Sequence, residues 1–118
     1  MLHSVNRLRK STEIDRVWKR GRSFYTPLLQ IKSITTNLGL IRCAVVVGSK
    51  VHKRAVVRNK IRRRVREVMR LTIPQMTGSL DMIIAAKKGA ELATYDALRT
   101  QLLEMLTKMH LLTPEKKL

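Results

Sequence analysis

One segment of the chain, residues 50–70, sets the strongest limits on the fold. Apolar side chains recur in it at every third or fourth position, the spacing that places them on one face of an α-helix: Val57, Ile61, Val65, Val68 and Met69. A helix with one apolar face has to bury that face against another element. The pattern therefore predicts a helix over about 55–71 that is docked on a core.

The other sides of this predicted helix and the loop before it are strongly basic. Glu67 is the one acid in the segment, and it is opposed by ten cations: Lys50, Lys53, Arg54, Arg58, Lys60, Arg62, Arg63, Arg64, Arg66 and Arg70. Ten cations less one acid carry nine of the chain's seventeen net positive charges. Because like charges at this density repel one another, we expect a polyanion that neutralises them. A solvated helix face usually mixes acids with its bases, so we interpret the segment as a nucleic-acid-binding surface.

A second group of cations surrounds Trp18: Arg7, Arg9, Lys10, Arg16, Lys19, Arg20 and Arg22. An indole beside phosphate-binding cations can stack on a nucleotide base. Trp18 also follows Ile14 by four residues on the same helix face, which suits a core position. Spacing alone leaves both interpretations open and favours the core.

Size and composition indicate one folded domain over residues 1–118. A chain of 118 residues, 44% of them hydrophobic, can bury a small core and is too apolar for a disordered basic tail. The N-terminal sequence lacks the apolar run of a signal peptide, and no stretch approaches the roughly eighteen apolar residues of a membrane span. We therefore expect a cytoplasmic protein with no membrane partner.

The remaining patterns predict short elements around the basic helix. They are a helix over about 12–20, strands within 24–36, 40–48 and 80–86, and a last helix from a cap at Thr94 to about 110. Pro27 lacks an N–H and favours an edge or the start of its strand. Cys43 alternates with Ile41 and Val45, so we expect it in the core. The order αββαβα with a mixed sheet predicts an α+β two-layer sandwich, with helices covering one sheet face and the other partly open.

The sequence contains no pattern of catalytic or metal-binding residues. The acids are scattered, the three histidines lie far apart, and Cys43 has no second cysteine or nearby histidine at metal-ligand spacing. The five glycines are dispersed and form no phosphate-binding loop. We do not expect an enzyme that acts without a partner.

Three segments resemble one known family. The run SKVHKRAVVRNKIRRRVREVMR resembles the arginine-asparagine-arginine signature of the bacterial ribonuclease P protein subunit, and RLRKSTEIDRVWKRGRSF resembles that family's opening helix. The segment DMIIAAKKGAELATYDALRTQLL follows in the same order, so the resemblance spans about 6–110. Lys60 and Lys87 stand where arginine is more common, and Ile14 where phenylalanine is usual. The lysines keep the charge but lose the bidentate geometry of arginine.

The resemblance implies a ribosomal protein S5 domain 2-like fold, with a left-handed β-α-β crossover around the basic helix. General topology rules would have predicted a right-handed crossover. The resemblance also implies that the protein joins a large catalytic RNA, and that the two remove the 5′ leader of precursor tRNA. Mg²⁺ held mainly by the RNA and the substrate performs the chemistry in that family, and no protein partner is implied.

Site residues follow from the same resemblance. It assigns Arg58, Asn59, Lys60, Arg62, Arg63 and Arg66 to the catalytic RNA, and we assign with them the neighbouring cations Lys50, Lys53, Arg54 and Arg70. The single-stranded leader is expected across the open sheet face and the first helix. Its candidate contacts are Trp18, Phe24 and Lys32, with Arg9, Lys19 and Arg22. The resemblance thus favours a leader contact for Trp18, with Phe24 and Lys32 on the same cleft.

Two other classes of protein fit part of the pattern. A small ribosomal or other structural RNA-binding protein would share the basicity without a role in cleavage, but would more often carry an extended basic tail. A DNA-architectural protein would fit the charge, but it usually dimerises through an apolar surface, which a mass measurement would reveal.

Overall fold

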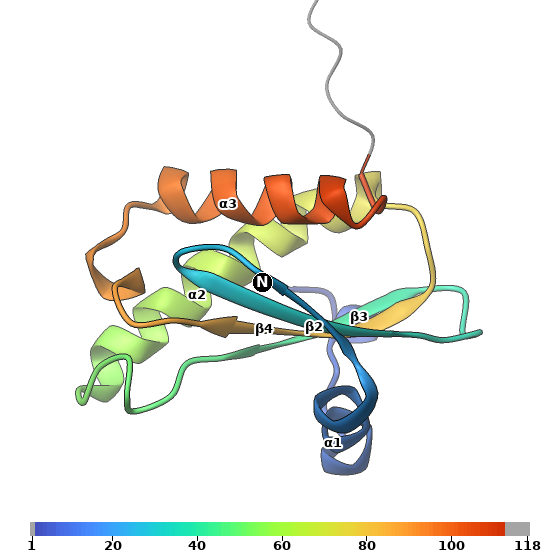
Figure 1. Cartoon of the computed structure of the whole chain (residues 1–118), viewed down its shortest axis with the longest axis horizontal. Coiled ribbons are helices and arrows are strands. Elements are labelled where there is room, and N and C mark those ends of the chain that lie inside the picture. The colour runs from blue at the N-terminus through green and yellow to red at the C-terminus, as the bar shows by residue number, and fades with distance from the viewer. Residues whose placement is uncertain (1, 113–118) are drawn as a thin grey trace, which may run out of the picture.

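A mixed four-stranded sheet lies at the centre of the protein (Figure 1). The computed structural model describes residues 2–112. Its elements are α1 (Ser11–Arg20), β1 (Arg22–Tyr25), β2 (Leu29–Thr35), β3 (Ile41–Val46), α2 (Ala55–Thr72), β4 (Leu80–Ala86) and α3 (Tyr95–Lys108), with short 3-10 helices at Ser4–Asn6, Ile73–Gln75 and Ala90–Leu92. The strand order is β1-β2-β4-β3, and only the β3–β4 pair is parallel. The predicted α+β class is confirmed, and α2 connects the parallel pair. The left hand of that crossover stays a prediction from the resemblance.

The segment 24–36, predicted as one strand, contains a hairpin. Pro27 lies in the turn between β1 and β2, where its missing N–H removes no ladder hydrogen bond. Thr26 closes this turn, since its N–H donates to the Leu29 carbonyl (2.8 Å) and its hydroxyl accepts from the Leu29 N–H (3.1 Å). The prediction of a single strand is therefore wrong, because Pro27 marks a reversal of the chain.

Gly21 lets α1 lead directly into β1. A Cβ at this position would clash with the Val17 carbonyl oxygen and lie 3.2 Å from both the N and the O of Ser33. Only glycine permits this close approach to β2. The pairing of Arg22 with Ser33 can therefore begin one residue after the helix.

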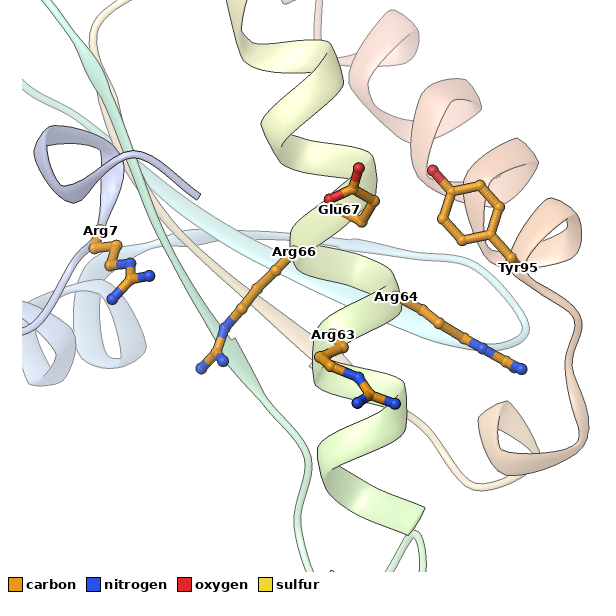
Figure 2. Close-up of a pocket in the computed structure, with 6 residues that line it drawn as sticks. All are labelled: Arg7, Arg63, Arg64, Arg66, Glu67 and Tyr95. Atoms are coloured by element: carbon orange, nitrogen blue, oxygen red, sulfur yellow. The ribbon is translucent and has the colours of Figure 1, made fainter. Parts of the chain in front are cut away.

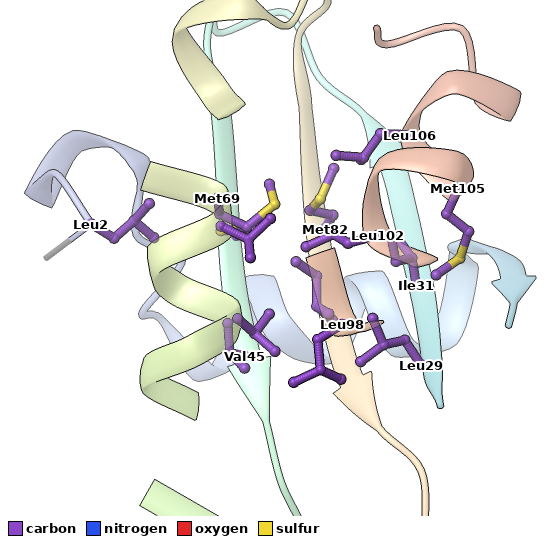
Figure 3. Packing of buried hydrophobic residues seen from close by; sticks show 14 of the residues in the cluster. Leu2, Leu29, Ile31, Val45, Met69, Met82, Leu98, Leu102, Met105 and Leu106 are labelled. Carbon is purple, nitrogen blue, oxygen red and sulfur yellow. The ribbon is translucent and has the colours of Figure 1, made fainter. Parts of the chain in front are cut away.

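The main core lies between the sheet and the helices α2 and α3 (Figure 3). Leu29 and Ile31 of β2 are fully buried there beneath Leu98 and Leu102 of α3. The predicted stripe of α2 is confirmed, with Ile61, Val65, Val68 and Met69 buried. The predicted cap of α3 is also confirmed, because the Thr94 hydroxyl accepts from the N–H of Ala97 (3.1 Å).

Cys43 belongs to this core, as its alternation with Ile41 and Val45 predicted. Its side chain is almost completely buried, and burial raises the pKa of the thiol to about 12. A thiol with so high a pKa carries little thiolate at neutral pH and is a poor nucleophile. Cys43 is therefore a packing residue.

A smaller apolar cluster on the other sheet face holds α1, which lies below the sheet in Figure 1. Val17 of α1 and Ile83 of β4 are fully buried in this cluster. Trp18 packs against it and remains half-buried. Because β4 also turns Met82 and Ile84 into the main core, this strand is buried on both faces, which explains its continuous apolar sequence. α1 packs mainly across β2 and β4 and covers only part of this face. The prediction that helices cover one sheet face is therefore wrong, since helices lie on both, while the partly open face is confirmed.

Three charged side chains tie α1 to β3 and β4. The guanidinium of Arg42 donates to both carboxylate oxygens of Asp81, from Nε (2.8 Å) and from Nη2 (2.7 Å). The same Nη2 donates to Oε2 of Glu13 on α1 (2.8 Å). These bonds, first to Asp81 and then to Glu13, raise the pKa of Arg42, and the bond from Arg42 lowers the pKa of Glu13. We call Glu13, Arg42 and Asp81 the α1 ion cluster.

The α1 ion cluster makes the stability of the fold depend on pH. Because the pKa of Glu13 is lowered in the folded chain, its ion pair stabilises the fold above pH 4.5, and this contribution is lost as the pH falls through the lowered pKa. We expect Glu13→Gln to be less stable than wild type at pH 7, with the difference disappearing in acid. Urea unfolding between pH 7 and pH 3, followed by the fluorescence of Trp18, the one tryptophan, measures it. Asp15→Asn on the exposed side of α1 is the control and should leave the free energy of unfolding unchanged. A loss of stability in Glu13→Gln that is equal at every pH would indicate a packing effect instead of an ion pair.

Candidate nucleic-acid interface

The loop after β3 and the helix α2 form one strongly basic surface. We call it the α2 surface and define it by ten residues: Lys50, Lys53, Arg54, Arg58, Asn59, Lys60, Arg62, Arg63, Arg66 and Arg70. Arg58 and Arg62 are half-buried, and the other eight are exposed. Because α2 turns its apolar stripe to the core, its cations occupy the remaining sides of the helix. The fold thus brings all ten residues predicted for the catalytic RNA onto one element and its adjoining loop.

Arg58 fixes the loop that precedes α2. Its Nη1 donates to the carbonyls of His52 (3.0 Å) and Lys53 (2.7 Å). The N–H of Arg54 donates to Nδ1 of His52 (3.1 Å), which closes the loop further. Arg58 therefore fixes the backbone of the loop that carries Lys53 and Arg54.

The asparagine of the signature is also held in one orientation. Nη2 of Arg62 donates to Oδ1 of Asn59, one turn away along the exposed side of α2. With its carbonyl oxygen engaged, the Asn59 amide presents its two N–H donors. Donors suit phosphate oxygens, ribose hydroxyls and the acceptor atoms of bases.

Two further arginines of this segment have intramolecular partners. Arg64 is a cation of this segment that was not predicted as a site residue. It donates through Nη1 to the carbonyl of Ala93 (2.7 Å) and ties α2 to the segment before α3. Arg70 forms a bidentate pair with Glu67, at 2.6 Å and 3.0 Å. Their hydrogen bond lowers the pKa of Glu67 and raises that of Arg70. Glu67 thus offsets the positive charge of Arg70 at the C-terminal end of the α2 surface. The rest of the α2 surface, which precedes Glu67 in the chain, stays cationic.

A hollow of about 450 Å³ lies within this basic region, with Arg63, Arg66 and Tyr95 among its walls (Figure 2). Arg7 also lines it, from the segment before α1, and in Figure 2 it lies on the same side of α2 as Arg66. Arg7 reaches this position because its segment forms a bridge to Cys43 at the edge of the sheet. The expectation that Arg7 surrounds Trp18 is therefore wrong, since a long-range pairing carries it to the other cluster of cations.

Trp18 and Lys32 lie together on the α1 side of the sheet. The ammonium of Lys32 donates to the Trp18 carbonyl (2.6 Å) and lies 5.7 Å from the centre of the indole ring. Trp18 packs against the small apolar cluster but remains half-buried. One part of the indole therefore contributes to the core, and the rest lies at the surface beside a cation.

Phe24 does not share this face. In the hairpin it pairs with Ile31, whose side chain is buried in the main core, and Phe24 packs against that core. Lys32 is the next residue along β2, so its side chain points to the opposite face. The prediction that Phe24 and Lys32 lie on the same cleft is wrong. Arg22 lies with Phe24, its Cζ 5.8 Å from the ring centre.

Two other cations predicted for the leader lie on α1 or just before it. Lys19 lines a shallow hollow on the outward side of α1, together with Asp15 and Arg16. Arg9 is exposed just before α1. Of the six candidate leader contacts, the fold joins Trp18 with Lys32 and Arg22 with Phe24, while Lys19 lies on α1 and Arg9 just before it.

One exposed aromatic residue received no role from the sequence. Tyr25 is 63% exposed and pairs with Gln30, so its side chain lies on the same face as Lys32. The ammonium of Lys87 lies 5.8 Å from its ring centre. Alternation along β1 places Tyr25 on this face. The sequence could not show this, because the hairpin that defines β1 was not predicted.

The described residues contain neither a membrane-spanning helix nor a cluster of metal ligands. Between residues 2 and 112, no helix combines the length and apolarity that a membrane crossing needs. In the same residues, no three His, Cys, Asp or Glu side chains gather closely enough to hold a metal ion.

Comparison with known sequences gives consistent results. The family model described as Ribonuclease P matches residues 2–110. A ribonuclease P protein component from Chloroflexus aggregans is 32% identical over 113 residues, which cover 95% of this chain and 83% of that protein. Another from Finegoldia magna is 35% identical over 102 residues, which cover 86% and 88%.

Solved structures have the same fold. The Staphylococcus aureus RNase P protein superposes with a TM-score of 0.82 at 23% identity, covering 92% of this chain and 98% of that one. The Thermotoga maritima RNase P protein gives 0.78 at 24% identity, covering 86% and 96%. Because the family model spans most of the chain and relatives above 30% identity align along nearly all of it, the chain belongs to the family of ribonuclease P protein components.

Proposed function

We propose that this protein binds a catalytic RNA through the α2 surface and that the two together remove the 5′ leader of precursor tRNA. Family membership supports the ribonuclease P context. The observation that carries the proposal is the α2 surface itself, where exposed arginines and lysines lie on a helix whose apolar stripe is buried in the main core. A fixed array of guanidinium groups suits the closely spaced phosphates of a folded RNA.

In this proposal the protein contributes binding and positioning. Mg²⁺ held mainly by the RNA and the substrate would supply the hydrolytic chemistry. The exposed cations of α2, such as Lys60, Arg63 and Arg66, would contact phosphates of the catalytic RNA. Arg58 would hold Lys53 and Arg54 in the loop where they can reach the same RNA.

The single-stranded leader would contact the α1 side of the sheet, at Trp18 and Lys32. An aromatic face beside an ammonium can stack one base while the cation attracts a neighbouring phosphate. Since α1 and α2 lie on opposite faces of the sheet, the leader and the catalytic RNA would not compete for the same residues. The protein could then hold both RNAs at once.

The division of labour is tested by reconstitution. We expect rigorously RNA-free protein to leave precursor tRNA intact, and leader removal to appear when a bacterial catalytic RNA and Mg²⁺ are added. Gel analysis of end-labelled precursor measures both. Cleavage by the protein alone would overturn the proposal, and a protein that binds RNA without promoting cleavage would favour the structural RNA-binding alternative.

The α2 surface is tested by the salt dependence of binding to the catalytic RNA. If Arg66 contacts a phosphate, Arg66→Ala should weaken binding and reduce the slope of log K against log salt by about one. Arg16→Ala makes the same charge change on the outward side of α1 and should leave the slope unchanged. If both variants lower the slope equally, Arg66 contributes to binding only through the net charge of the protein.

The two roles of Trp18 are separated by comparing precursor and mature tRNA. If the indole stacks on a leader base, Trp18→Ala should weaken precursor binding by about 1–3 kcal/mol and spare mature tRNA. If its role is core packing, the change should lower the melting temperature strongly and impair both RNAs alike. Thermal melts and binding measured on one preparation decide between them, and unchanged discrimination would exclude the leader contact.

A further inference from the structure

The α1 side of the sheet continues beyond the part that α1 covers. Four residues, one from each strand, form its next row: Tyr25, Gln30, Ala85 and Val46, joined by the pairs Tyr25–Gln30, Gln30–Ala85 and Val46–Ala85. Tyr25 is 63% exposed and Val46 37% exposed. We call these four residues the open row.

The open row lies next to Trp18 and Lys32. Gln30 and Lys32 are two residues apart on β2, so their side chains share a face and lie about 7 Å apart along the strand. That separation equals the rise of about two stacked nucleotides. A single strand of RNA that contacts Trp18 can therefore reach the open row within a few nucleotides.

Tyr25 is exposed but held in position. Its hydroxyl accepts from Nε2 of Gln30 (3.4 Å), and the β1–β2 pairing fixes its backbone. Lys87 donates to the Thr26 carbonyl (3.1 Å) and places its ammonium 5.8 Å from the ring centre of Tyr25. Tyr25 belongs to neither apolar cluster, so packing does not explain an aromatic residue here.

The same combination of groups thus occurs twice on this face. Trp18 has the ammonium of Lys32 at 5.7 Å, and Tyr25 has that of Lys87 at 5.8 Å. Each pair offers an aromatic face for a base and a cation for the adjoining phosphate. Single-stranded nucleic acid is bound by such alternation of aromatic rings and positive charge.

We propose that Tyr25 and Lys87 form a second subsite for the single-stranded leader, in addition to the one at Trp18 and Lys32. This inference rests on the proposed function, since it extends the same leader-binding face. The two subsites lie at different points along the RNA, so each contributes only when the leader is long enough to reach it. Affinity for precursor tRNA should therefore rise in two steps as the leader is lengthened.

The test uses the holoenzyme and precursor tRNAs whose leaders grow by single nucleotides. For wild type we expect two rises in affinity with leader length. Each rise in affinity should be between about fivefold and about a hundredfold. Tyr25→Ala should abolish one of these rises, and Trp18→Ala should abolish the other. Tyr25→Phe keeps the ring and should retain both. Leu92→Ala removes a side chain that is 86% exposed elsewhere, and it is the control for loss of exposed apolar surface.

The outcomes distinguish this inference from the proposed function. If wild type binds precursor no better than mature tRNA at any leader length, the leader-binding function fails and the second subsite fails with it. If Trp18→Ala loses discrimination while Tyr25→Ala matches wild type at every length, only the second subsite is overturned. Equal loss of precursor and mature tRNA binding by Tyr25→Ala would also overturn it.

Discussion

The burial of β4 on both of its faces is the constraint on which the rest of the structure depends. Met82 and Ile84 face the main core under α2 and α3, and Ile83 faces the small cluster under α1. A strand with this pattern has to be covered on both sides. The sheet therefore separates α1 from α2, and with them the two groups of residues that we propose bind different RNAs.

Charge is distributed unevenly over this framework. Glu13 and Asp81 join elements through Arg42, where they contribute to the position of α1. Among residues 2–112, Arg70 is the one member of the α2 surface that forms an ion pair with an acid. Of these three paired acids, Glu13 and Asp81 thus join elements of the fold, and Glu67 offsets a cation of α2. A surface of this kind is stabilised when a polyanion binds it, which links the stability of the protein to its function.

The sequence predicted the features that depend on local periodicity. The stripe of α2, the burial of Cys43 and the cap at Thr94 each follow from spacing within one element. The sheet face on which Phe24 lies depends on the register of the β1–β2 hairpin. That register is set by the turn at Pro27, and the sequence pattern had not predicted a turn there. Arg7 reaches the α2 hollow through pairing with Cys43, 36 positions away along the chain, a contact that no local pattern indicates.

The central claim is that the leader and the catalytic RNA occupy opposite sides of the sheet. Photocrosslinking in the assembled holoenzyme tests it most directly, with a photoreactive uridine placed either in the leader or in the catalytic RNA, followed by identification of the crosslinked peptides. We expect leader crosslinks in α1, β1 and β2, and crosslinks to the catalytic RNA in the loop before α2 and in α2 itself. Leader crosslinks concentrated on the α2 surface would contradict the account.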